Sequence, residues 1–199
     1  MTYEYEHLYR SQGFAAVCGV DEAGRGPLAG PVFAAAVILP DGLENIGLND
    51  SKKLTEKKRD ALFDIITEKA VAWCVASADE KEIDELNILN ATFLAMKRAV
   101  DGLAVRPDIA LIDGNRRPGT GIREETIVKG DAKSISIAAA SILAKVSRDR
   151  YMLELDKKYP EYCFAKHKGY PTALHYEMIK KYGVSPVHRL SFLKTLDKH

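Results

Sequence analysis

The order of the apolar segments most constrains how this chain can fold. Two β-capable segments, residues 15–20 and 32–39, come first and are joined by the turn-rich residues 23–31. Consecutive strands with such a connection favour an antiparallel pair. After them, strand-like and helix-like segments alternate, which is typical of parallel strands joined through helices. The sequence therefore predicts an α/β fold, with a mixed sheet and helices on its faces.

Helices are expected where apolar residues recur at helical spacing. Four segments have this pattern: 54–70, 87–100, 134–159 and 172–182. Thr55 is suited to cap the first, Gly102 to close the second, and Pro160 to stop the third. Three further strands are expected at residues 71–76, 109–112 and 125–129. Trp73, the only tryptophan, is expected in the core.

Length and composition limit the class of protein. With 199 residues, 46% hydrophobic and 29% charged, the chain suits one globular domain. Its longest apolar run, residues 31–40, is too short to cross a bilayer, and the N-terminus lacks the apolar core of a signal peptide. Three widely spaced cysteines argue against a disulfide framework or a zinc knuckle. We expect a cytoplasmic monomer with no membrane contact.

The net charge of +1 hides an asymmetry along the chain. Residues 151–199 carry nine Lys and Arg against five Asp and Glu, whereas residues 1–150 have a net charge of −3. Such a basic end could bind a polyanion. Random variation of surface charge explains the asymmetry equally well.

Four acidic residues stand where strands end or helices begin: Asp21, Glu22, Asp113 and Asp131. Side chains at such positions project into the cleft at the sheet edge. If the first strand and the strand at 109–112 are neighbours, the carboxylates converge, which is costly unless a cation lies between them. Oxygen ligands favour Mg²⁺ or Mn²⁺ over zinc. Taken singly, each acid could instead be a turn former or a helix cap.

Other polar residues are suited to bind a phosphate chain. Gly24-Arg25-Gly26 runs into a strand and not a helix, so it is no dinucleotide loop, but its backbone could approach a ligand closely. Lys52 lies in a basic run, and Lys168 and Tyr170 share a loop suited to phosphate contact and stacking. A tight turn, a solvated helix face and a packing residue are the alternative interpretations.

Together these segments resemble the bacterial type 2 ribonucleases H, the ribonuclease HII family. The similarity lies in seven blocks whose order and spacing cover roughly residues 17–192: GVDEAGRGP at 19–27, LNDSKKL at 48–54, EIDELNIL at 82–89, LIDGN at 111–115, VKGD at 128–131, IAAASILAKV at 137–146 and HKGYPT at 167–172. Residues 116–123 and the segment after Phe192 depart from the pattern.

The resemblance implies a ribonuclease H-like fold: a central mixed five-stranded sheet flanked by helices, with a helical C-terminal extension. The catalytic core would span residues 1–160, and residues 161–199 would form a basic extension packed on the same domain. By position, the catalytic, metal-binding acids of the family fall on the four acids named above. Its ribonucleotide-sensing motif falls on Gly24, Arg25 and Gly26, and its junction tyrosine on Tyr170.

The resemblance also implies an activity. Such an enzyme hydrolyses the RNA strand of RNA–DNA hybrids and nicks DNA on the 5′ side of an embedded ribonucleotide, leaving 3′-hydroxyl and 5′-phosphate ends. Two-metal hydrolysis with Mn²⁺ or Mg²⁺ would perform this chemistry. The rival hypotheses are a type 1 or type 3 ribonuclease H or a junction resolvase, an inactive nucleic-acid-binding module, and a metal-dependent phosphatase for small molecules.

Overall fold

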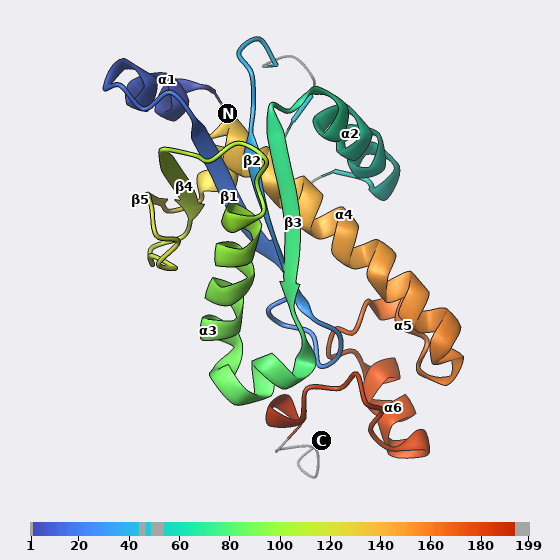
Figure 1. Cartoon of the computed structure of the whole chain (residues 1–199). Coiled ribbons are helices and arrows are strands. Elements are labelled where there is room, and N and C mark those ends of the chain that lie inside the picture. Colours follow the sequence, from blue (N-terminus) through green and yellow to red (C-terminus); the bar gives the residue numbers. More distant parts are fainter. Residues whose placement is uncertain (1, 44–46, 49–53, 194–199) are drawn as a thin grey trace.

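A five-stranded mixed sheet forms the centre of the computed structural model, which describes residues 2–43, 47–48 and 54–193 (Figure 1). The strands are β1 (Val17–Ala23), β2 (Val32–Ile38), β3 (Ala72–Ala78), β4 (Ile109–Asp113) and β5 (Arg123–Ile127). Their order across the sheet is β3-β2-β1-β4-β5. The pairs β1–β2 and β2–β3 are antiparallel, whereas β1–β4 and β4–β5 are parallel. The predicted mixed sheet is therefore confirmed.

Helices cover both faces of this sheet. The long ones are α2 (Glu56–Lys69), α3 (Glu80–Asp101) and α4 (Ile135–Lys158). In Figure 1, α3 lies in front of the sheet, and α4 crosses behind it with α2 alongside. Alternate residues of β2 separate the two layers, since Ala34 and Ala36 pack on the α3 side while Ala35 and Val37 pack on the α4 side. These small side chains allow the helices to lie close to the sheet.

The remaining helices of the described residues are short. They are α1 (Glu4–Ser11), α5 (Phe164–His167) and α6 (Ala173–Tyr182), with 3-10 turns η2 (Gly130–Ala132), η3 (Pro160–Tyr162) and η4 (Leu190–Phe192). The segment after α6 returns to the core, where Ala29 and His188 form a β-bridge. No helix in the described ranges is long and apolar enough to cross a membrane.

Most predicted elements are confirmed, and their differences from the structure have physical causes. Thr55 and Ser134 cap α2 and α4 through their hydroxyl oxygens, as polar N-caps do. The helix predicted from residue 87 is the second part of α3, which kinks at Asn87, where φ is 68°. The prediction for Trp73 is wrong. It lies on the edge strand β3 and is 40% exposed, with its ring against Phe63.

Candidate active site

Two of the candidate acids lie on adjacent parallel strands at the centre of the sheet. Asp21 belongs to β1 and Asp113 ends β4, and the residues just before them, Val20 and Ile112, are register partners. Asp21 and Asp113 therefore lie side by side on neighbouring strands, at the same edge of the sheet. The sequence placed Asp21 and Glu22 just after the first strand, but β1 continues to Ala23, so both acids are strand residues.

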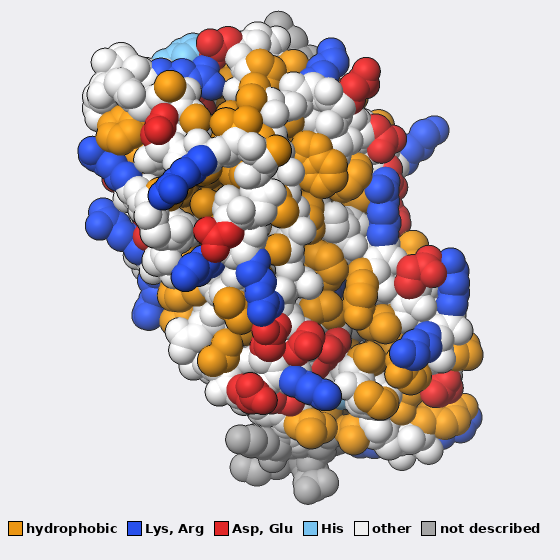
Figure 2. All heavy atoms as spheres, viewed as in Figure 1, with side chains coloured by type: hydrophobic (Ala, Val, Ile, Leu, Met, Phe, Trp, Pro, Cys, Tyr) orange, Lys and Arg blue, Asp and Glu red, His pale blue; other side chains and the backbone are white. Residues whose placement is uncertain are grey.

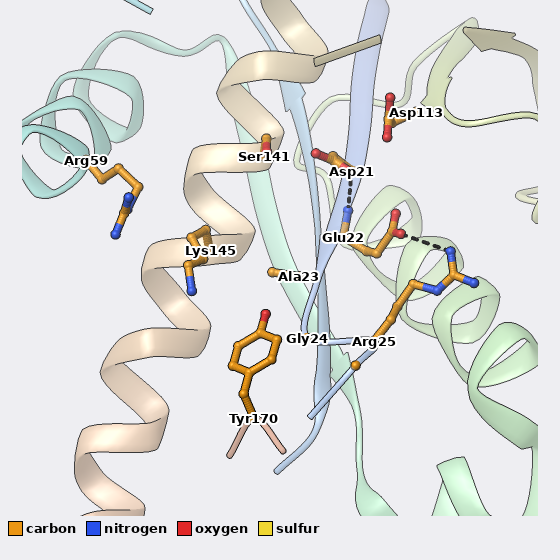
Figure 3. A pocket seen from close by; sticks show the side chains of 11 residues that line it. Asp21, Glu22, Ala23, Gly24, Arg25, Arg59, Asp113, Ser141, Lys145 and Tyr170 are labelled. Atoms are coloured by element: carbon orange, nitrogen blue, oxygen red, sulfur yellow. Dashed lines mark hydrogen bonds and ion pairs between the residues drawn. The ribbon is translucent and has the colours of Figure 1, made fainter. Parts of the chain in front are cut away.

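A cleft of about 590 Å³ opens over these strand ends (Figure 3). Acidic side chains form one part of its lining, and the glycine-containing loop after β1 forms another. The residues that line it are Asp21, Glu22, Ala23, Gly24, Arg25, Gly26, Arg59, Asp113, Ser141, Lys145 and Tyr170. The structure thus brings seven of the ten predicted site residues to a single cleft.

Burial and mutual repulsion dominate the electrostatics of the acids. Asp21 is 6% exposed, and burial raises the pKa of its carboxyl well above the usual value, with further increases from the charges of Glu22 and Asp113. Burial also raises the pKa of Glu22, although the nearby guanidinium of Arg25 opposes this. The Glu22 Oε1 atom lies 3.4 Å from Arg25 Nη1. The carboxylates are therefore held together at an electrostatic cost.

Asp131 lies beside this group and does not line the cleft. It belongs to η2, whose first residue, Gly130, donates its N–H to Asp113 Oδ1 at 2.6 Å. A Cβ at position 130 would lie 2.6 Å from the Ile137 side chain and 3.2 Å from Asp113 Oδ1, so this close approach requires glycine. Through Gly130, the turn that carries Asp131 is joined directly to the end of β4.

Four of the six predicted substrate-binding residues also line the cleft: Gly24, Arg25, Gly26 and Tyr170. Gly24 has a φ of 94°, a backbone conformation that favours glycine. A Cβ on Gly26 would lie 3.8 Å from the Tyr170 ring, so the loop and the tyrosine face each other. Tyr170 is 39% exposed, and its carbonyl oxygen lies 3.0 Å from His175 Nδ1. The ring is therefore accessible at the surface of the cleft, and the contact with His175 holds the backbone of Tyr170 in place.

Sequence reasoning missed three residues that line the cleft: Arg59 of α2, and Ser141 and Lys145 of α4. In Figure 3, Lys145 and Arg59 lie on the side of Tyr170 that is opposite Arg25. Hydrogen bonding from Ser141 lowers the pKa of Asp21 and so opposes the effect of burial. The available signal was the four-residue spacing of Ser141 and Lys145, which puts both on one face of a helix.

Two predicted residues have other positions. Lys52 lies outside the described residues. Lys168 does not line the cleft, because its Nζ atom donates to the carbonyl of Ala165 at 2.8 Å. Its own carbonyl accepts a hydrogen bond from Arg148 at 3.0 Å, so its backbone belongs to the support of the Tyr170 loop.

The donor set of the cleft suits a hard divalent cation. It consists of carboxylate oxygens, and the buried acids repel one another, which a positive ion between them would relieve. Within the described ranges, no group of three or more His, Cys, Asp or Glu side chains is arranged to hold an ion as it stands. Glu22 is turned toward Arg25 (Figure 3), and its Oε1 atom forms the ion pair with Arg25 Nη1.

Comparison with known proteins identifies the family. The family model described as Ribonuclease HII matches residues 18–195. The chain belongs to the ribonuclease HII family. Two curated relatives named Ribonuclease HII are 56% identical over 194 residues (Caldicellulosiruptor bescii) and 62% identical over 176 residues (Dechloromonas aromatica). The alignments cover 98% and 88% of this chain and 94% and 90% of the relatives.

Solved structures agree with this assignment. The ribonuclease H2 from Pyrococcus horikoshii superposes with a TM-score of 0.77 at 31% identity, over 92% of this chain and 96% of that one. A ribonuclease HIII solved in complex with Mn²⁺ has a TM-score of 0.65 at 20% identity, over 84% of this chain and 63% of that one, and shows the shared fold. The ribonuclease HII chain is thus a divalent-metal-dependent endoribonuclease, with ribonuclease H activity on RNA–DNA hybrids.

Proposed function

We propose that this ribonuclease HII nicks duplex DNA on the 5′ side of a single embedded ribonucleotide, in addition to cleaving hybrids, and so serves to remove ribonucleotides from DNA. The observation that carries the proposal is the pairing of the Gly24–Gly26 loop with the Tyr170 ring across one cleft. This pair lies beside the acidic cluster, so one strand could contact both features at once.

The acids would hold the metal. Asp21, Glu22 and Asp113 face one cleft, and Asp131 is joined to it through Gly130. Bound Mg²⁺ or Mn²⁺ ions, two in the proposed mechanism, would activate water for attack on phosphorus and stabilise the departing 3′ oxygen. Attack by water, and not by the neighbouring 2′-hydroxyl, leaves 3′-hydroxyl and 5′-phosphate ends. No protein general base is then required.

The distribution of charge in the cleft suits a phosphodiester chain. Carboxylates occupy the end over β1 and β4, whereas Arg59 and Lys145 line the cleft on the other side of Tyr170 (Figure 3). Lys145 Nζ lies 5.9 Å from the centre of the Tyr170 ring. With the scissile phosphate at the acids and the next sugar at Tyr170, a following phosphate would meet these two cations.

The loop supplies backbone donors beside this path. Within the described part of the chain, no hydrogen bond uses the N–H groups of Arg25 or Gly26. The carbonyls of Gly24 and Arg25 are already occupied by Arg189. A 2′-hydroxyl is the group that distinguishes RNA from DNA at one position. Its oxygen can accept hydrogen bonds from such N–H groups. The Tyr170 ring would pack on the following sugar, where a second 2′-hydroxyl would crowd it.

Product mapping tests this function. The substrates are a DNA duplex with one ribonucleotide, the same duplex without it, and one with four consecutive ribonucleotides, each with Mg²⁺ or Mn²⁺. We expect one nick, on the 5′ side of the single ribonucleotide, and no cleavage of the all-DNA duplex. Cleavage of only the four-ribonucleotide duplex would overturn the proposed substrate choice.

A further inference from the structure

Two arginines from distant parts of the chain are completely buried beneath the cleft. Arg148 belongs to α4 and Arg189 to the segment after α6, and both are 0% exposed. Burying a charge costs several kcal/mol unless its hydrogen-bonding groups are satisfied. A completely buried arginine therefore indicates a structural role that offsets this cost. The hydrogen-bond partners of the two arginines show what that role is.

Arg189 binds the loop after β1 at three points. Its Nη2 atom donates to the carbonyl of Gly24 at 2.7 Å, its Nη1 atom to that of Arg25 at 3.0 Å, and its Nε atom to that of Gly30 at 2.8 Å. A planar guanidinium with fixed donors restricts both the position and the orientation of the peptides it contacts. The ribonucleotide-facing loop is thus fixed from below by a residue 164 positions away from Arg25.

Arg148 joins the far end of the same loop to the Tyr170 segment. Its Nη2 and Nε atoms donate to the carbonyls of Ala29 and Pro31, at 3.1 and 3.2 Å, and its Nη1 atom donates to that of Lys168 at 3.0 Å. The guanidinium lies directly under Gly24, where a Cβ would come within 2.0 Å of its Nε atom. One side chain therefore contacts both walls of the cleft.

An acidic helix start balances the two buried charges. In Figure 2, acidic side chains gather over the beginning of α3, where the sequence has Asp79, Glu80, Glu82, Asp84 and Glu85. Burial lowers the pKa of both arginines, while the charge of Glu80 raises it. Asp84 also accepts hydrogen bonds from the N–H groups of Leu190 and Ser191, both at 2.9 Å, which anchors the chain just after Arg189.

We propose that Arg148 and Arg189 are positioning residues for substrate choice, which fix the Gly24–Gly26 backbone and the Tyr170 loop at the separation that selects a ribonucleotide followed by a deoxyribonucleotide. This inference rests on the proposed function. By binding the carbonyls of Gly24 and Arg25, Arg189 fixes the orientation of the two peptide units that carry the N–H groups of Arg25 and Gly26. The C-terminal extension thereby contributes to specificity without contacting the substrate.

The test compares the wild type with Arg189→Lys, which keeps the charge but cannot donate from three fixed positions. Affinity is measured with Ca²⁺ in place of the catalytic ion, for two duplexes that differ by a single 2′-hydroxyl. We expect the ratio of the two affinities to fall about 10-fold, the effect of losing one or two net hydrogen bonds to the 2′-hydroxyl. Affinity for the all-DNA duplex should change little, whereas the unfolding temperature should fall, because a lysine cannot satisfy all three buried carbonyls. Arg150→Lys, at an exposed arginine of α4, is the matched control.

The outcomes separate the inference from the proposed function. If the wild type binds the two duplexes with equal affinity, the proposed recognition of the 2′-hydroxyl is wrong. A high wild-type ratio that Arg189→Lys preserves, or a parallel loss of affinity for both duplexes, would overturn the positioning role alone. If Arg189→Lys does not fold, Arg148→Lys is judged by the same ratio and the same two outcomes.

Discussion

The imidazole rings of His175 and His188 share a hydrogen bond between their Nε2 atoms, at 3.1 Å, in the interior of the C-terminal extension. The N–H of Ser185 donates to His188 Nδ1, so His188 must donate from Nε2, and His175 then donates from Nδ1 to the carbonyl of Tyr170. This chain requires both rings to be neutral, and it ends at the residue that faces the cleft.

The histidine pair predicts acid sensitivity. Burial lowers the pKa of His175 and of His188 from 6.5 to about 4. Between these values the unfolded chain binds protons that the folded chain does not, so stability is complete above pH 6.5 and is lost as the pH falls toward 4. Each ring contributes a slope of at most ~1.4 kcal/mol per pH unit.

Urea unfolding from pH 8 to 4.5 measures this slope. His188→Asn should flatten it, whereas His7→Asn, whose imidazole is largely exposed, should leave it unchanged. Equal slopes for the wild type and His188→Asn would show that the pair is already protonated in the folded protein, contrary to the hydrogen-bond chain.

Asp113→Asn tests the metal-binding role of the acids. The amide oxygen can still accept the N–H of Gly130, so the fold should persist, but an amide is a poor ligand for Mg²⁺. We expect kcat to fall at least ~100-fold, since even partners of metal ligands cost 10- to 100-fold. Duplex affinity in Ca²⁺ should not be lost, because one negative charge is removed beside the phosphate. Asp101→Asn, at the exposed end of α3, is the control, and near-normal cleavage by Asp113→Asn at saturating Mg²⁺ would refute the role.

Tyr170→Ala should lower kcat/KM on the single-ribonucleotide duplex on the order of 10-fold or more, since stacking on an aromatic ring contributes about 1–3 kcal/mol. Tyr170→Phe should lose less if the ring, and not the hydroxyl, makes the contact. Tyr182→Ala removes another exposed tyrosine, remote from the cleft lining, and serves as the control. Full activity of Tyr170→Ala would remove the ring from the proposed substrate path.

Lys145→Gln tests the cationic side of the cleft through salt dependence. Each neutralised phosphate contributes about −0.9 to the slope of log affinity against log salt concentration. We expect the slope for duplex binding to become shallower by about this amount, with the cleavage position unchanged. Lys157→Gln, on the same helix but paired with Glu154 at the surface, should leave the slope as it is. An unaltered slope for Lys145→Gln would mean that this lysine serves only its ion pair with Asp149.

Local signals predicted much of the three long helices, because helix periodicity and capping depend on short-range chemistry. Thr55 was visible as a hydroxyl cap and residue 134 as a helix start, and Asp113 is the last residue of its apolar strand. The adjacency of β1 and β4 was left conditional, since strand pairing is a long-range property. The prediction that Trp73 lies in the core was wrong for the same reason. Strand order places β3 at the sheet edge, and the residues around Trp73 in the sequence do not reveal that order.

The support of the cleft could not be predicted in this way. Arg148 and Arg189 look like ordinary basic residues in the sequence, and only the fold shows that each satisfies three backbone carbonyls far away along the chain. Arg59 likewise reaches the cleft from α2, a helix whose basic residues fit a solvated surface equally well.

The contact between β1 and α4 leaves no room for a side chain between the strand and the helix. A Cβ on Gly19 would lie 2.1 Å from the carbonyl carbon of Ser136, so strand and helix touch through their main chains two residues before Asp21. No side chain intervenes there whose replacement could adjust the spacing. New substrate preferences, whether evolved or engineered, must therefore arise in the loops and flanking helices, while the acids keep one fixed geometry.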